Sequence, residues 1–241
     1  MQHNAEDHTF KLEVNEYTDM TDDEWANHML VRGGLELPAE SPLEAELDEP
    51  DFELPPPGTL DWVRAGVMSP LEDRGQCGSC WAFSATGALE ARYHLLKNQR
   101  IDLSEQELID CGFLTGTNGC NGGLIEDAFV FIEIFGIAQE SEYPYTAKDG
   151  ACKTFLDYSS LVALGVPALF QGARIKRVTM IPQGSEYHLK KALTTGPVSV
   201  SLRGSAFNFK HFGSGILTGA CDGPINHSVL AVGYGIENGI K

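Results

Sequence analysis

The sequence contains no run of eighteen apolar residues, so we do not expect a membrane span. No stretch near Met1 has the charged and apolar parts of a secretory signal. Basic residues are scarce at the start, where residues 1–58 hold two Lys and Arg against 16 Asp and Glu. With a net charge of −17, the chain is a poor candidate for binding nucleic acid.

The surplus of acidic residues lies almost wholly in the first quarter, because residues 59–241 hold 18 acidic against 15 basic side chains. An acidic block of this kind is typical of a solvated, partly disordered segment. Residues 35–58 are also rich in proline and contain no Lys or Arg, which indicates an exposed linker. The rest of the chain is long enough to bury a core of its own.

A cysteine at the start of a helix organises the chain. Residues 80–97 contain few helix breakers and carry apolar side chains on several faces, which predicts a helix buried nearly all round. Ser79 is placed to cap this helix, so Cys80 falls in its first turn. There the unpaired N–H groups and the positive end of the helix dipole favour the thiolate. The thiolate is the nucleophilic form, so the position suits covalent catalysis.

Two further helix starts are marked by capping patterns. Thr21 and Glu24 form a capping box, which predicts a short helix over residues 22–31. Ser104 caps another helix, and Glu107 is expected to bond back to the Ser104 backbone in return.

The remaining elements follow from periodicity and chain breakers. They are helices at 124–135 (ended by Gly136) and 185–194, strands at 198–202, 216–217 and 229–234, and a hairpin turn at Asn238-Gly239. A helical first half followed by a strand-rich second half suggests two lobes with a cleft between them.

Two motifs carry a family resemblance. The first is Cys77-Gly78-Ser79-Cys80-Trp81, and the second is Asn226-His227-Ser228 with the apolar stretch that follows it. His227 comes 147 residues after Cys80. This signature at this spacing is typical of the papain family. From about residue 10 to its end, the chain closely resembles a cathepsin L-like cysteine protease with its propeptide.

The resemblance implies an α+β fold with a helical N-terminal lobe, a β-rich C-terminal lobe and the active-site cleft between them. It divides the chain into a partial inhibitory propeptide with the acidic linker, residues 1–57, and a peptidase domain, residues 58–241. Glu13-x-Asn15-x-Tyr17-x-Asp19 is similar to the Gly-x-Asn-x-Phe-x-Asp motif of such propeptides. The last strands of the second lobe and the Asn-Ser-Trp-Gly stretch, whose asparagine orients the histidine, have no counterpart here. We expect both beyond residue 241.

The same resemblance implies a cysteine endopeptidase made as a zymogen, which acts through a Cys80–His227 thiolate–imidazolium pair and an acyl-enzyme. It implies no cofactor and no metal. In the family a glutamine six residues before the nucleophile helps to bind the oxyanion, and here that position is Arg74. The longer, cationic side chain is expected either to donate to the oxyanion or to pair with a neighbouring carboxylate.

The resemblance also assigns the six cysteines. It pairs Cys77 with Cys120 and Cys111 with Cys152, leaves Cys80 free, and expects a partner for Cys221 beyond residue 241. Disulfides are typical of oxidising compartments. We therefore expect the protein in a lysosome or vacuole, or outside the cell.

The expected partners are peptide or protein substrates and the chain's own propeptide, and the protein is expected to be a monomer. Gly122 and Gly123 fall where the family forms a wall for bound peptide, although a plain turn is the other interpretation. The other positions carried over for substrate binding are Ile125, Ser201, Ile225, Asn226 and Ser228. Of these, Ile125, Ser201, Ile225 and Ser228 fall where the family lines its main specificity pocket. This set is small or apolar and carries no charge, which implies a preference for a bulky apolar residue at the second position before the cut. The two isoleucines also fit an ordinary core.

Two other functions fit part of the pattern. Cys77-x-x-Cys80 before a helix is also a redox arrangement, but four further cysteines, the acidic leader and the histidine motif argue against an oxidoreductase. A papain-like protein that binds without cleaving fits Arg74 and the missing C-terminal stretch. The cysteine spacings do not form the two close pairs of a zinc site. Asn226-His227-Ser228 is formally a glycosylation sequon, but it overlaps the histidine motif.

The acidic propeptide suggests a pH switch. Protonation of its carboxylates as the pH falls through about 4–5 would weaken the ion pairs that hold it to the lobes. Stability from such pairs is present above the carboxylate pKa and lost below it.

Overall fold

The computed structural model describes residues 3–6, 8–29, 58–70, 73–154, 172–219, 223–237 and 239–240. The helices are α1 Asp22–Met29, α2 Cys80–Lys97, α3 Glu105–Cys111, α4 Ile125–Phe135, α6 Glu186–Leu193 and α7 Phe207–Lys210. The strands are β1 Phe10–Leu12, β2 Leu60–Asp61, β3 Val198–Leu202, β4 Phe212–Gly215, β5 His227–Ala231 and β6 Gly233–Tyr234. Short 3-10 turns are η1 His3–Ala5, η2 Gly112–Leu114 and η3 Gly119–Asn121. No helix in these ranges is long and apolar enough to cross a membrane.

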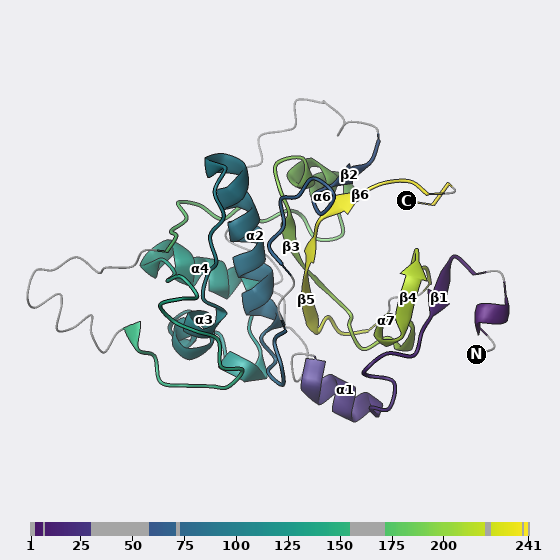
Figure 1. The fold of residues 1–241 in the computed structure, drawn as a ribbon, viewed down its shortest axis with the longest axis horizontal. Helices are drawn as coiled ribbons and strands as arrows, with labels where there is room; N and C mark the ends of the chain where they lie inside the picture. Colours follow the sequence, from purple (N-terminus) through teal and green to yellow (C-terminus); the bar gives the residue numbers. More distant parts are fainter. Residues whose placement is uncertain are drawn as a thin grey trace, which may run out of the picture.

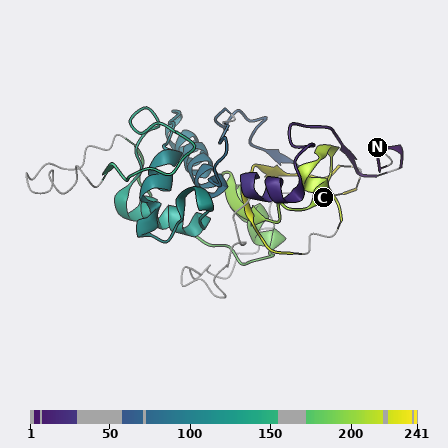
Figure 2. The ribbon, with the colours of Figure 1, turned by 90° about the horizontal axis from the view of Figure 1, so that it is seen from below.

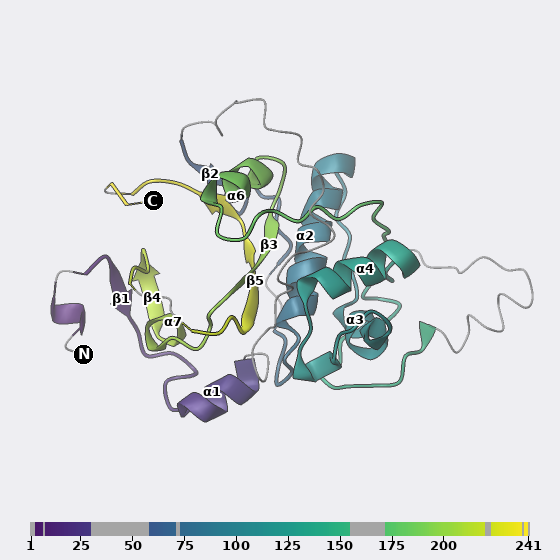
Figure 3. The same cartoon turned by 180° about the vertical axis from the view of Figure 1, so that it is seen from behind.

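The fold has a helical half and a strand-bearing half (Figure 1). Helices α2, α3 and α4 form the first half, and β3 to β6 with α6 and α7 form the second. The N-terminal segment, defined as residues 3–29, lies against the second half (Figure 2). Seen from behind, α2 stands between α4 and the β3–β5 pair (Figure 3). The α+β class and the order of helices before strands are as the sequence predicts.

The core of the helical half is built around the first part of α2. Trp81, Leu108 and Phe131, from three different helices, are fully buried. The prediction that α2 is buried nearly all round is wrong for its last turns, where Leu95 is 36% and Leu96 is 65% exposed. The helix extends past the core it packs against, so its apolar periodicity alone did not show where burial stops.

Two disulfides close the helical half. They join Cys77 to Cys120 and Cys111 to Cys152, which is the pairing that the resemblance implies. The first ties the chain just before α2 to η3, and the second ties the end of α3 to the chain after α4. Cys221 lies outside the described residues.

The described strands form three antiparallel pairs, β1–β4, β2–β6 and β3–β5. In the β3–β5 pair, Val198 lies opposite Ala231 and Leu202 opposite His227. The strand predicted over 229–234 is divided at Val232, because its two parts pair with different strands. The strand predicted at 216–217 is wrong: β4 ends at Gly215, and Ile216 bonds the carbonyl of Thr9 instead.

The other predicted elements agree closely. The helices predicted at 124–135 and 185–194 are α4 and α6, each within one residue at either end. Glu237 and Ile240 bond each other's backbone as the predicted hairpin requires, although Asn238 itself lies outside the described residues. The linker predicted over 35–58 lies outside them as well, apart from Gly58.

The capping box of α1 is confirmed, because the Glu24 carboxylate accepts from the Thr21 backbone and hydroxyl while the Thr21 hydroxyl accepts from the Glu24 N–H. α1 is described as far as Met29, and residues 30–31 lie outside the described residues.

Half of the capping pattern predicted for α3 is wrong. Ser104 does accept from the Glu107 N–H, at 3.0 Å. The Glu107 carboxylate does not return to Ser104. It accepts from the Ala138 N–H at 2.6 Å and the Thr154 hydroxyl at 2.5 Å. Glu107 therefore ties α3 to chain segments that the local pattern cannot reveal.

Glu107 is also a buried charge, and burial raises its pKa above the ordinary carboxyl range. A raised pKa means that the folded state holds the proton more tightly than the unfolded state. The contribution of Glu107 to stability is therefore greatest at acid pH and falls as the pH rises from the unfolded pKa to the folded one.

We expect Glu107→Gln to gain stability relative to the parent as the pH rises from 4 to 8, because the amide has no proton to lose where the parent must ionise a buried carboxyl whose pKa is raised. Urea unfolding with the disulfides intact measures this difference. Glu237→Gln, an exposed site, is the control and should follow the parent at every pH. A difference that shrinks with rising pH would contradict the assignment.

Candidate active site

Cys80 is the first residue of α2 and the one cysteine among the described residues outside a disulfide. Its side chain is 4% exposed. The prediction that Ser79 caps this helix is wrong, because the Ser79 hydroxyl accepts no N–H of the first turn and lies 2.8 Å from the Tyr145 hydroxyl. The Ser79 hydroxyl therefore does not cap the N–H groups at the positive end of the α2 dipole, where Cys80 lies.

His227 is the first residue of β5, in the strand-bearing half. It is 8% exposed, and the Phe209 ring meets it edge-on with 5.9 Å between ring centroids. The residue before it is fixed on both sides: the Asn226 N–H bonds the Leu202 carbonyl, and Asn226 Oδ1 accepts from the Gly204 N–H at 2.9 Å. The backbone that presents His227 is thus held in one position.

α2 and β5 lie side by side and run in the same direction (Figure 1). Ser84 Oγ donates to the Val229 carbonyl at 2.7 Å, and a Cβ on Gly87 would meet Leu230 at 3.4 Å. The carbonyl of the same Ser84 accepts a hydrogen bond from the Ser199 hydroxyl of β3 at 2.8 Å, so the helix also contacts the partner strand of β5. Cys80 and His227 are therefore the first residues of two neighbouring, co-directional elements.

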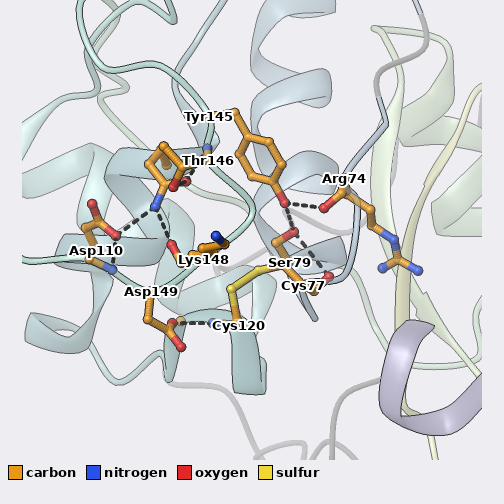
Figure 4. The surroundings of a disulfide bond; sticks show 12 residues. Arg74, Cys77, Ser79, Asp110, Cys120, Tyr145, Thr146, Lys148 and Asp149 are labelled. Carbon is orange, nitrogen blue, oxygen red and sulfur yellow. Dashed lines mark hydrogen bonds between the residues drawn. A yellow bond between two sulfur atoms is a disulfide. The ribbon is translucent and has the colours of Figure 1, made fainter. Parts of the chain in front are cut away.

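Arg74 is anchored through its backbone. Its carbonyl accepts from the Tyr145 hydroxyl at 2.7 Å, and the same hydroxyl lies beside Ser79. Burial raises the pKa of Tyr145 to about 12, so this donor stays protonated at physiological pH. Figure 4 shows the Arg74 guanidinium pointing away from Tyr145, toward the strand-bearing half. The sequence alone did not point to Tyr145, because no local pattern links it to Ser79, 66 positions earlier, or to Arg74, 71 positions earlier.

The fold explains why glycine stands at both Gly122 and Gly123. Gly122 has a φ of +116°, a conformation that favours glycine. A Cβ on Gly123 would come within 2.9 Å of the Trp81 ring and 2.8 Å of Thr117. Gly123 is thus needed where the chain passes over Trp81, next to Cys80. The peptide-wall role predicted for both glycines stays a prediction.

The structure brings together part of the set expected to bind substrate. Ser201 of β3 and Ser228 of β5 lie opposite each other with 3.4 Å between their hydroxyls, and Asn226 is next in the chain to His227. Ile225 is half-buried. Ile125 is buried in the core of the helical half, as the core interpretation expects. No group of His, Cys, Asp or Glu in the described ranges has an arrangement that could hold a metal ion.

The N-terminal segment is docked on the strand-bearing half. β1 extends β4 as an antiparallel partner, with Phe10 opposite Gly215. Asn15, from the propeptide-like motif, donates to the Lys210 carbonyl at 2.8 Å. The Trp25 indole is buried and donates to the Gly204 carbonyl at 3.1 Å. The backbone of Gly204 therefore bonds the N-terminal segment through its carbonyl and Asn226, the neighbour of His227, through its N–H.

The chain is similar to proteins of one family. The model described as papain family cysteine protease matches residues 56–241. Germination-specific cysteine protease 1 of Arabidopsis thaliana is 38% identical over 238 residues, which cover 96% of this chain and 60% of that protein. Procathepsin L of Rattus norvegicus is 37% identical over 233 residues, which cover 95% of this chain and 65% of its own. The solved proform of the ragweed pollen cysteine protease Amb a 11 has a TM-score of 0.81 at 29% identity, covering 99% of this chain and 71% of that one.

This chain thus spans 60% and 65% of the length of these two curated relatives.

Proposed function

Because this chain belongs to the papain family of cysteine proteases, we propose that its protein is a cysteine endopeptidase made as a zymogen. Cys80 is the nucleophile and His227 the proton carrier. The acidic N-terminal part, residues 1–57, is the inhibitory propeptide with its linker, and residues 58–241 belong to the peptidase domain.

One observation carries this proposal, the packing of α2 on β5. Ser84 follows Cys80 by one helical turn, a rise of about 6 Å, and Val229 follows His227 by two strand residues, about 6.6 Å. The Ser84–Val229 hydrogen bond joins the two elements at 2.7 Å. Because the two distances along α2 and β5 are nearly equal, Cys80 and His227 lie at about the same height along the helix–strand interface. This placement supports a thiolate–imidazolium pair.

The proposed chemistry uses this pair twice. The Cys80 thiolate attacks the peptide carbonyl carbon, and the carbonyl oxygen takes the negative charge beside the N–H groups at the start of α2. When the C–N bond breaks, the His227 imidazolium gives its proton to the leaving amine. His227 then accepts a proton from water, whose oxygen attacks the thioester. The C–S bond breaks, the carboxylic acid leaves, and the thiolate is restored.

The docked N-terminal segment supports the zymogen part of the proposal. Phe10, Leu12 and Trp25 are all buried against the strand-bearing half. Two disulfides favour maturation in an oxidising compartment. We infer a lysosomal, vacuolar or secreted protease that acts as a monomer on peptide or protein substrates.

We expect a preference for a bulky apolar residue at the second position before the cut. Ser201 and Ser228 are small and uncharged, and the half-buried Ile225 precedes Ser228 by three residues. A dipeptidyl substrate library measures this preference. Ser201→Glu should shift it toward basic residues, while the exposed control Ser214→Glu on β4 should not. A parent that prefers arginine at this position would contradict the assignment.

Active-site labelling tests the function. The purified chain is treated at about pH 5 with an epoxide carried on a peptide, and the adduct is mapped by mass spectrometry. We expect rapid, peptide-dependent labelling of Cys80 alone. No labelling, or equal labelling of Cys80 and Cys221, would overturn the proposal and favour a papain-like protein that binds without cleaving.

A further inference from the structure

A buried basic pair lies beneath the N-terminal segment. Lys210 and His211, at the end of α7, are 5% and 7% exposed. Residues 13–20, here called the strap, cross them directly. The Glu13 N–H bonds the His211 carbonyl at 2.9 Å, and Asn15 bonds the Lys210 carbonyl. The Lys210 ammonium donates to the Met20 carbonyl of the strap.

The strap offers a hydrogen-bond acceptor to one charged group here, the Lys210 ammonium. The Met20 carbonyl accepts a hydrogen bond from the Lys210 ammonium. The His211 ring instead packs against the aromatic ring of Phe207, with 4.5 Å between the ring centroids. A neutral imidazole suits this surrounding. A protonated imidazole on the buried His211 would place a second cation next to the Lys210 ammonium that the strap bonds, which is costly without a matching anion.

We propose that His211 is a proton-operated release for the N-terminal segment: when its imidazole takes up a proton beside the buried Lys210, the strap loosens and β1 separates from β4. The inference deepens the proposed zymogen function, since it names the group that controls release. It places the trigger on the peptidase side of the contact rather than on the carboxylates of the segment.

The charges around His211 come from both sides. Burial lowers the pKa of His211 most, the Lys210 ammonium on its own side lowers it further, and Asp22 at the start of α1 acts in the opposite direction. The Glu13 side chain lies over Gly213, two residues further on, and Glu24 interacts with Lys210. Asp22, Glu13 and Glu24 are all exposed, so water screens them from the buried ring.

The direction of the pH effect follows from linkage. After release, His211 is uncovered and titrates near 6.5, the ordinary value of histidine. Its pKa in the docked state is lower, so docking expels a proton. Docking is at full strength above the undocked pKa and weakens as the pH falls below about 6.5. This window lies above the range of about 4–5 in which the carboxylates of the segment titrate.

The test uses the full chain with Cys80→Ala, so that self-cleavage plays no part. Trp25 is 5% exposed when docked, so its emission shifts to the red and becomes open to acrylamide quenching on release. We expect a transition between pH 7.5 and 4 in this background. His211→Gln, which keeps a polar side chain without the charge, should move the midpoint down by about half a pH unit or more. His211→Lys, a permanent charge, should release Trp25 already at pH 7.5.

His188→Gln is the matched control, because His188 lies on α6 and bonds Ser185 away from the segment. It should leave the midpoint unchanged. Near-UV circular dichroism of the disulfide-closed half verifies that each variant is folded. Equal midpoints for the parent and His211→Gln would overturn the inference, and so would a docked His211→Lys at pH 7.5. Peptidase activity is not needed here, so an inactive parent with the expected midpoints would count against the proposed function alone.

Discussion

Replacing His227 with glutamine is expected to lower the turnover of peptide substrates by roughly 10⁴–10⁶-fold, because the thiolate–imidazolium pair acts as one unit. The same change should alter the alkylation of Cys80 by a small reagent such as iodoacetamide. At one and the same pH the reaction should be fast in the parent and much slower in His227→Gln, because the variant has no imidazole to take up the thiol proton.

The control for this prediction is His188→Gln, which removes a histidine from the same half of the molecule. Its turnover and alkylation profile should match those of the parent. Mass spectrometry is used to measure alkylation at Cys80 separately, because Cys221 could also react with the reagent. An unchanged alkylation profile in His227→Gln would separate the histidine from the thiol and remove the basis of the mechanism.

Replacing Arg74 is expected to have the second largest effect. The Tyr145 hydroxyl holds the Arg74 carbonyl beside Ser79, the residue before Cys80, and the guanidinium points toward the strand-bearing half (Figure 4). We propose that the guanidinium donates to an oxyanion at the start of α2. We expect Arg74→Ala to lower kcat by about 10²–10³-fold, the usual loss for one oxyanion donor.

Arg74→Gln separates the donor from the charge. An amide donor of the kind that the family uses should keep kcat within about tenfold of the parent. Arg64→Ala, an exposed arginine after β2, is the control for general effects of lost charge. If Arg74→Ala turned over substrate as fast as the parent, the arginine would have no part in binding the oxyanion.

The sequence predicted α2 and its bounds correctly because the signal is local: apolar periodicity over eighteen residues with few helix breakers. Its capping was not local. Ser79 has the residue type of a cap, but Tyr145 competes for its hydroxyl from 66 residues away. Glu107 is a second case, since its carboxylate bonds Ala138 and Thr154 rather than its own helix start. Both errors arise where tertiary contacts override a pattern of near neighbours.

The candidate site divides in the same way. Cys80 and His227 could be named from two motifs and their separation, but neither motif shows how α2 packs on β5. That information lies in the Ser84–Val229 bond, between a helix and a strand 145 residues apart. Lys210 and His211 gave no signal at all. Both residues bond the strap, and an acidic segment gives no pattern that shows which basic residues it contacts.

The disulfide connectivity has a consequence for biosynthesis. Along the chain the four bridged cysteines pair first with third and second with fourth, as Cys77–Cys120 and Cys111–Cys152. During synthesis from the N-terminus, Cys77, Cys80 and Cys111 are made before Cys120, so any disulfide that forms among these three is non-native. Such a bond must be broken by thiol–disulfide exchange before folding ends. A chain in which such a bond has formed needs disulfide isomerisation as well as oxidation to reach the native pairing, and the Cys80 thiol can itself enter the wrong pair.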